Sequence, residues 1–301
     1  MSALAVLLSA RMVAETVRMA VPYAAAATGG VWSEKSGVVN IALEGKLLVG
    51  GLASIAVTAA TGRPWAGLVA GVLAGMLVGL LHVIVVEYGR ASAIVSGLAI
   101  NVLAAAGSRF ALRALYDSSS NSPAVAGFEG FASAGPGVGR VFAALVDPTT
   151  VTVAVFVLAS AFAFVRTPFG LHVRAAGAEP RAARSAGLDV RRIRLVAVTL
   201  AGAVTGLGGV ALAFDQHQFQ SGMSGGRGYI ALAAVILSRW RPLHAAAFAF
   251  AFAVLDAVQI VLQDQDVVPT ALVQTLPYVA TLVVLAGMAR ARTAATQARA
   301  L

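Results

Sequence analysis

The sequence has no cysteine and few charged residues, and both shortages narrow what the protein can be. Only 12% of its 301 residues are charged, whereas soluble globular proteins carry roughly a quarter. So few charges cannot cover the surface of a water-soluble domain. Without cysteine, disulfides and thiolate-bound metals are excluded. The composition therefore excludes a soluble enzyme, a disulfide-built secreted domain and a disordered chain.

What the sequence has instead is a series of long apolar runs without charge. A helix needs about 20 apolar residues to cross a bilayer core, and most of these runs reach that length with their flanks. They predict an all-α, polytopic transmembrane helix bundle with eight to nine membrane segments. The expected segments are 12–29, 40–60, 65–86, 91–113, 149–166, 195–214, 229–238, 243–262 and 269–289.

The number of membrane segments depends on how two of them, 229–238 and 12–29, are interpreted. A helix over 229–238 would be only about 15 Å long, so a broken or re-entrant segment is expected near 221–238. The glycine-rich residues before it fit backbone that lines a cavity, and they fit an external loop equally well. Residues 12–29 have cations on both sides, so this segment either crosses the membrane or lies at its interface.

The formal charge of +9 does not indicate nucleic-acid binding. The cations stand at the ends of apolar runs rather than in a patch interleaved with aromatic residues, and seven arginines lie between 166 and 194. Short loops with this bias stay in the cytoplasm. We therefore expect a single transmembrane domain over 1–301, with a cytoplasmic loop at 167–194 and an extracytoplasmic loop at 114–148.

No motif indicates catalysis. The pair Gly45-Lys46 is followed by Leu47 instead of Ser or Thr, so the chain has no recognisable phosphate-binding loop. The histidines lack metal-ligand spacing, and each is expected in a loop or at the interface. We expect no catalytic residue, no metal and no cofactor. The histidines are His82, His172, His217 and His244.

Polar residues inside the apolar segments are the candidates for a solute pathway, because burying them in lipid is costly. Asn40 and Glu44 are four residues apart, which places them on one face of a helix. A carboxylate at mid-bilayer costs about 2.5–3.5 kcal/mol. Glu44 therefore needs a partner, for which Lys46, Lys35 and a helix end are the candidates.

Three further stripes follow helical spacing. Two are polar, and each can either hydrogen-bond between helices or line a solute path. The third consists of glycines at every fourth position, which is typical of closely packed membrane helices. The stripes are Ser92, Ser96, Gly97 and Asn101; Asp256, Gln259 and Gln263; and Gly67, Gly71, Gly75 and Gly79.

The arginine-rich loop predicts a short amphipathic helix at about 180–186. Pro180 suits the first position of a helix and Gly187 its end, and Glu179 stands near the positive N-terminal end. A loop that only joins two spans needs no such helix. The pattern indicates a segment that docks onto another protein.

Three motifs, in the order expected, resemble those of a known family. Residues 170–188 (GLHVRAAGAEPRAARSAGL) look like the coupling loop of bacterial ABC importer permeases of the branched-chain amino acid, ribose and nucleoside group. Residues 36–45 (SGVVNIALEG) resemble the N-terminal motif of the nucleoside-type members. Residues 226–237 (GRGYIALAAVIL), followed by RWRP at 239–242, are similar to that subgroup's third motif.

The resemblance implies a multi-pass permease of the bacterial cytoplasmic (inner) membrane that imports nucleosides and is not itself an enzyme. It implies three partners: an ABC ATP-binding subunit, a second homologous permease, of which this chain looks like the shorter, and an extracytoplasmic solute-binding lipoprotein. Simple sugars or branched-chain amino acids are alternative solutes. An ion-gradient-driven secondary transporter, with Glu44 or Asp256 as proton carrier, is the alternative class, against which the docking helix argues.

The resemblance also implies residue roles. The coupling motif carries over to Gly177, Glu179, Pro180, Arg181 and Gly187. The candidate ATPase-coupling residues are these five with Arg174 and Arg184. The candidate substrate-pathway residues are Asn40, Glu44, Ser96, Asn101, Gly228, Asp256 and Gln259. Lys46 stands where many relatives have an apolar residue, which leaves the surroundings of Glu44 open.

Overall fold

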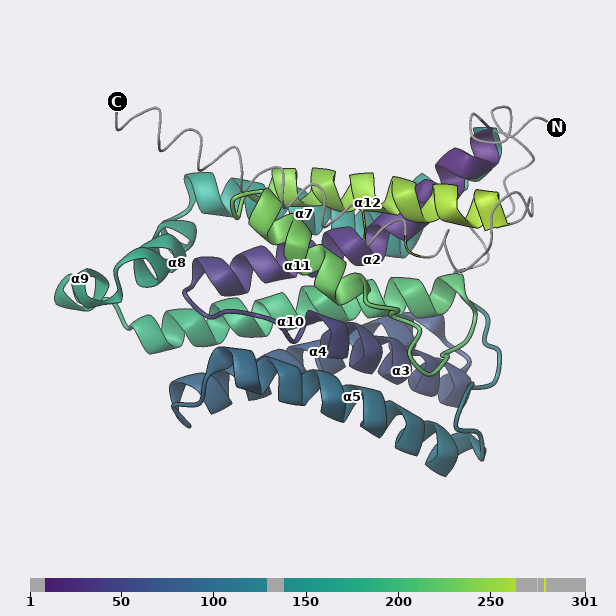
Figure 1. Ribbon diagram of the computed structural model, residues 1–301, viewed down its shortest axis with the longest axis horizontal. Coiled ribbons are helices and arrows are strands. Elements are labelled where there is room, and N and C mark those ends of the chain that lie inside the picture. The colour runs from purple at the N-terminus through teal and green to yellow at the C-terminus, as the bar shows by residue number, and fades with distance from the viewer. Residues whose placement is uncertain (1–8, 129–137, 264–274, 276–278, 280–301) are drawn as a thin grey trace.

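The computed structural model describes residues 9–128, 138–263, 275 and 279. These residues form helices without a named strand, which confirms the all-α prediction (Figure 1). Most helices run along the long axis of the molecule. The helices are α2 (Ala10–Lys35), α3 (Leu43–Thr61), α4 (Pro64–Glu87), α5 (Ala93–Tyr116), α6 (Val138–Val146), α7 (Pro148–Arg166), α8 (Pro168–Ala178), α9 (Pro180–Ser185), α10 (Val190–Asp215), α11 (Arg227–Leu237) and α12 (Pro242–Gln263).

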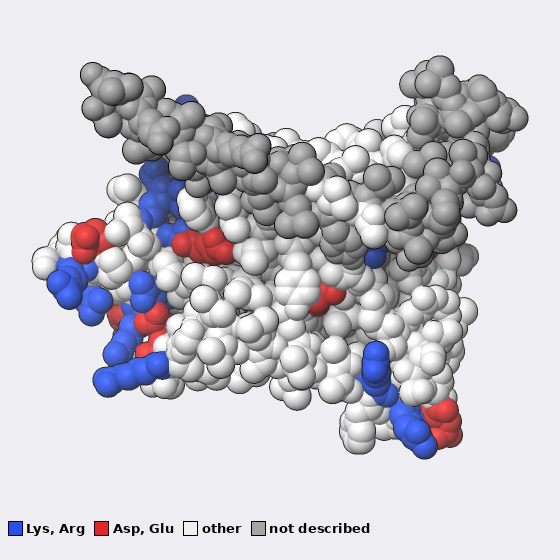
Figure 2. All heavy atoms as spheres, viewed as in Figure 1, with Lys and Arg blue, Asp and Glu red and all other residues white. Residues whose placement is uncertain are grey.

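Six of these helices, α3, α4, α5, α7, α10 and α12, are long and apolar enough to cross a membrane. The expected eight to nine segments are not confirmed. Helix α11 has only 11 residues, α2 is long but carries charges near both ends, and 269–289 lies outside the described residues except for 275 and 279. In Figure 2 the charged side chains gather toward the two ends of the long axis and leave the middle of the face almost uncharged.

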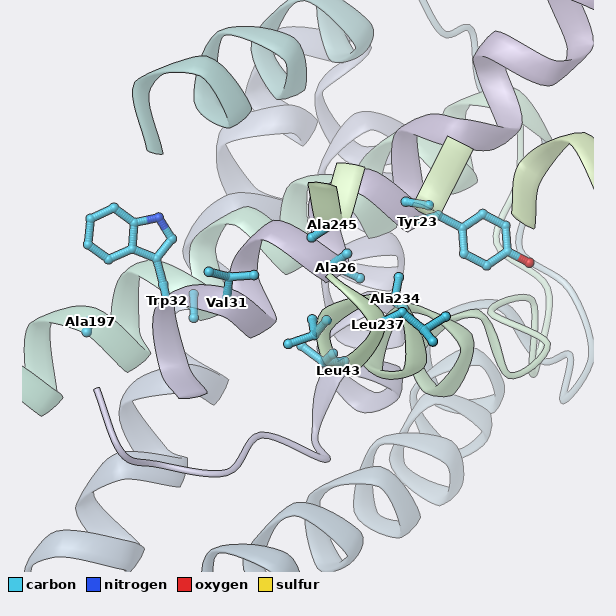
Figure 3. Packing of buried hydrophobic residues seen from close by; sticks show 14 of the residues in the cluster. Tyr23, Ala26, Val31, Trp32, Leu43, Ala197, Ala234, Leu237 and Ala245 are labelled. Atoms are coloured by element: carbon cyan, nitrogen blue, oxygen red, sulfur yellow. The ribbon is translucent and has the colours of Figure 1, made fainter. Parts of the chain in front are cut away.

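Helix α2 lies in the centre of the bundle and packs against α10, α11 and α12. The Oγ of Ser9 caps its start by accepting a hydrogen bond from the backbone N–H of Met12 (3.3 Å). Figure 3 labels Tyr23, Val31 and Trp32 of α2 among the residues of the main apolar core, and all three are buried. The sequence left residues 12–29 between a span and an interfacial segment, and the structure makes them part of a buried helix.

The glycine stripe of α4 packs directly on the backbone of α10, as its spacing predicts. A Cβ built at Gly75 would lie 2.5 Å from the carbonyl oxygen of Gly202 and 2.6 Å from the Cα of Gly206. The other face of α4 is exposed and carries Val69, Leu77 and similar residues. Small residues allow this approach where lipid offers no hydrophobic drive between helices.

Both long connections contain helices. Residues 114–148 include the end of α5 and α6, and residues 167–194 include α8, α9 and the first turn of α10. Helix α9 begins at Pro180, as expected, and ends at Ser185, with Gly187 just beyond it at a φ of 83°. Helices α8 and α9 lie together at one end of the long axis, on the left of Figure 1.

Candidate functional site

The candidate site lies where two helices begin inside the bundle. Helix α2 ends at Lys35 and α3 begins at Leu43, which is fully buried, and the 36–42 segment between them is not helical. Helix α11 begins at Arg227 after turns in residues 216–226. Non-helical backbone is tolerated at membrane depth only where protein buries it or water reaches it, so both interruptions need polar partners.

Side chains from four helices supply those partners for the 36–42 segment. Four of its seven carbonyl groups accept hydrogen bonds from side chains of α2, α4, α5 and α10. The bonds run from Ser33 Oγ to Val38 (2.9 Å), from His82 Nε2 to Val39 (3.2 Å), from Asn101 Nδ2 to Ile41 (2.9 Å) and from Arg194 Nε to Ser36 (3.0 Å).

Glu44, in the first turn of α3, holds the start of α11. Its Oε1 accepts hydrogen bonds from the Ser224 hydroxyl (2.6 Å) and the Gly226 amide (2.8 Å), and its Oε2 accepts one from the Gly228 amide (2.8 Å). A Cβ at Gly228 would overlap the backbone of Glu44. Helix N-termini bind anions, so of the three candidate partners the helix end is the correct one.

Asn101 of α5 makes hydrogen bonds to the start of α3 and to α11. Its Oδ1 accepts from the Gly45 amide (2.8 Å), and its Nδ2 donates to Ile41 and to the hydroxyl of Tyr229 (3.1 Å). The Tyr229 residue is 46% exposed while Asn101 is only 6% exposed. The arrangement places hydrogen-bonding groups of α3, α5 and α11 beside a partly exposed aromatic ring.

Lys46 is fully buried one turn above the start of α3. Its Nζ donates to Oδ1 of Asn40 (2.7 Å), while Nδ2 of Asn40 is buried without a hydrogen-bond partner among the described residues. The expectation that Asn40 and Glu44 share a helix face is wrong, because Asn40 precedes the helix. The side chain that contacts Asn40 is therefore Lys46, and not Glu44 as helical spacing predicts.

His82 of α4 corrects a second expectation. It is fully buried, not interfacial, with Nδ1 2.9 Å from the Oγ of Ser96 and Nε2 bonded to the 36–42 segment. A carbonyl can only accept, so the hydrogen sits on Nε2 and Nδ1 accepts from Ser96. Ser96 therefore reaches the site only through His82.

A second polar cluster adjoins the first at the start of α11. Asp256 of α12 pairs with Nη2 of Arg227 (3.3 Å) and accepts from the hydroxyl of Tyr23 (2.9 Å), and the Arg227 guanidinium lies 5.9 Å from the centre of the Tyr23 ring. Gln259, one turn further along α12, is partly exposed, and its side chain makes no hydrogen bond with the described residues. Asn40, Glu44, Ser96, Asn101, Gly228 and Asp256 are thus brought together, and Gln259 is not.

The candidate coupling residues lie at the α8–α9 end, away from Glu44. Most are exposed, and the Nε of Arg184 donates to the carbonyl of Pro180 (3.2 Å). Gly177 differs, because a Cβ there would overlap the carbonyl oxygen of Lys35 at the end of α2. The exposed members are Arg174, Glu179, Arg181, Arg184 and Gly187.

Sequence reasoning missed part of the site. Tyr23, Ser224, Arg227 and Tyr229 were not among the candidates, although an arginine between glycine-rich turns and an apolar helix was a usable signal. Tyr23 gave no signal, because one tyrosine in an apolar run is ordinary. Within the described residues, no cluster of His, Asp or Glu could hold a metal ion.

Apolar helices of membrane-crossing length, two helices that begin inside the bundle, and a polar cluster at their meeting point define a multi-pass membrane transport protein. The chain belongs to the family described as the branched-chain amino acid transport system / permease component, whose model matches residues 12–285. It is therefore a permease of the cytoplasmic (inner) membrane, a transport component rather than an enzyme.

Individual relatives are similar over most of their length. The guanosine ABC transporter permease protein NupQ of Bacillus subtilis (strain 168) is 32% identical, over 92% of this chain and 91% of that protein. The nucleoside ABC transporter permease protein NupC of Lactococcus lactis subsp. cremoris is 31% identical, over 91% of each. The putative glucose ABC transporter permease protein TsgC13 of Haloferax volcanii is 32% identical, over 81% of this chain and 75% of that protein.

Proposed function

We propose that this chain is the nucleoside-conducting permease subunit of an ATP-driven ABC importer. It works with a separate ATP-binding subunit, a second homologous permease and an extracytoplasmic solute-binding lipoprotein. The observation that carries the transport role is the meeting of α3 and α11 at Glu44 inside the bundle. Helices broken near the midplane commonly flank transported solutes. The nucleoside assignment is supported by two relatives, one a guanosine and the other a nucleoside ABC transporter permease protein.

The chemistry of the cluster suits a neutral, polar solute with an aromatic base. The half-exposed Tyr229 offers its ring as a stacking surface, while Asn101 and Glu44, whose polar groups are bonded within the protein, hold the backbone around it. In the proposed pathway, Asn40, Ser96, Gly228 and Asp256 shape this region. Gln259 would meet the solute further along α12.

The proposed topology has eight crossings. To the six apolar helices it adds α2, whose 26 residues would extend about 39 Å, and residues 269–289, with α11 as a half-helix. The α8–α9 end faces the cytoplasm because its arginines outnumber its acids. Residues 117–128, which contact 217–221 through backbone hydrogen bonds, then lie outside.

Helix α9 is the proposed docking element for the ATP-binding subunit. We expect the paired substitution Glu179→Arg and Arg181→Glu to insert normally and to reduce ATP-driven uptake at least tenfold, because like charges brought together across an interface cost several kcal/mol. The measurement is uptake in membrane vesicles together with the amount of protein inserted. Wild-type uptake by this variant would remove the support for docking through α9.

The substrate assignment is tested with labelled solutes. Cells that produce the complete importer are expected to accumulate nucleosides, to lose this uptake when ATP is depleted, and to keep it when the proton gradient is collapsed. Uptake of glucose without nucleosides would favour the activity named for the Haloferax relative. Uptake lost with the proton gradient while ATP remains would favour a secondary transporter instead.

A further inference from the structure

The 36–42 segment touches both α8, which together with α9 forms the docking helices, and the site around Glu44. At its start, the backbone of α8 rests on it: a Cβ at Gly177 would overlap the Lys35 carbonyl oxygen and lie 3.0 Å from the Gly37 amide nitrogen. Gly37 itself has a φ of 92°, which non-glycine residues rarely adopt. Two residues beyond the other end of the segment stands Glu44, which holds α11. One short stretch of chain therefore connects both places.

Arg194 ties the start of this stretch to α4 and α10. Its Nε donates to the carbonyl of Ser36 (3.0 Å), and its Nη1 pairs with Glu87 at the end of α4 (2.7 Å). The side chains of Arg194 and Glu87 are 17% and 11% exposed. Arg194 belongs to α10 and Glu87 to α4, the two helices that meet through their glycines. Movement of α8 would therefore act on the segment against a fixed point.

We propose that the 36–42 segment is the mechanical link between the docking helices and the Glu44 site, and that Arg194 is the positioning residue that holds this link against α4 and α10. The inference rests on the proposed ATP-driven import. When α8 moves with the ATP-binding subunit, the segment turns about the Ser36–Arg194 bond. Its far end then shifts α3 and the start of α11, which Glu44 joins.

The test separates coupling from folding. Arg194→Met alone leaves Glu87 buried without its cation, so the informative variant is Arg194→Met with Glu87→Gln, which leaves no unpaired charge. The matched control is Arg192→Met, on the same helix, where the Arg192 side chain is 86% exposed. Each variant is assayed as the complete importer in vesicles, for ATP hydrolysis and for solute uptake in the same preparation.

We expect the double variant to keep its ATP-binding subunit and its basal hydrolysis, and to import at least about tenfold less solute per ATP than the wild type. Arg194→Lys should recover part of this ratio, because the single ammonium nitrogen keeps the charge but not the two separate donor positions, Nε and Nη1, of the guanidinium. The Arg192 variant should match the wild type. A double variant with the wild-type ratio would overturn the proposal. Loss of the ATP-binding subunit would also overturn it, by placing Arg194 in the docking surface.

A direct measurement follows the segment itself. Because the chain has no cysteine, Val39→Cys, at a residue 43% exposed, gives a single thiol on the segment, and Ser92→Cys gives one on the turn before α5. The labelling rate at position 39 should differ between the ATP-free and the ATP-trapped importer, and only when Arg194 is present. The rate at position 92 should stay constant. Equal rates at position 39 in both states would refute the link.

The two proposals fail in different ways. If the wild-type chain purifies without any ATP-binding subunit, the proposed import function is wrong. If the subunit is present and hydrolysis drives uptake equally well without Arg194, only the link is wrong.

Discussion

Glu44→Ala is expected to reduce solute uptake by about a hundredfold, the largest effect of any single substitution at the site. The alanine would leave the Ser224 hydroxyl and the amides of Gly226 and Gly228 without an acceptor. An unsatisfied buried donor costs about 1–3 kcal/mol, and about 3 kcal/mol is already more than a hundredfold. The start of α11 would lose the group that fixes it to α3.

The experiment compares uptake by Glu44→Ala and Glu44→Gln with uptake by Asp117→Asn, at an exposed acid that ends α5. The glutamine variant should also be impaired. Its NH₂ group replaces one of the two acceptor oxygens, and this donor would face the donors that Glu44 now accepts from. Each rate is divided by the amount of inserted protein. Full uptake by the alanine variant would show that the junction of α3 and α11 is dispensable for transport.

Gly75→Val is expected to prevent stable folding of the bundle. Its side chain would enter the backbone of α10, 2.5 Å from the carbonyl oxygen of Gly202. Overpacking of a close contact typically costs about 1–3 kcal/mol, and here both neighbours are main-chain atoms that cannot change rotamer, so we expect at least about 3 kcal/mol. Thermal unfolding in detergent, followed by size-exclusion chromatography, measures the loss.

The control is Gly107→Val on α5, where an added Cβ meets nothing within 4 Å in this chain. Both substitutions put a β-branched residue into a helix, so the difference in helix propensity cancels. If Gly75→Val melts at the same temperature as Gly107→Val, close contact between α4 and α10 does not limit stability.

The apolar helices were predictable from the sequence because a long run without charge is typical of a helix that crosses a membrane. The segments over α4, α5 and α10 needed only hydropathy and length. Helix α2 was harder, because Arg18 and Lys35 obscure a helix that the surrounding protein buries. Helices α6 and α8 are short, and tertiary packing rather than a local pattern decides whether such pieces are helical.

The site was predictable in its residues but not in its connections. Glu44 and Asn101 stood out as polar residues in apolar runs, and the need of Glu44 for a partner followed from desolvation alone. The start of α3 at Leu43 could not be predicted, because most of the bonds that hold the 36–42 segment come from residues far along the chain. The placement of Asn40 beside Lys46 depends on that interruption.

The non-helical 36–42 segment also has a consequence for the biogenesis of the protein. Of its four carbonyl groups bonded by side chains, three wait for donors on later helices, and the last donor, Arg194, stands 158 residues after Ser36. A chain is made from its N-terminus at about 5–20 residues per second, so the ribosome delivers this donor roughly 8–30 seconds later. During that interval the segment has no complete set of partners. The Ser36 carbonyl therefore gains its bond to Arg194 only after α10 has been made.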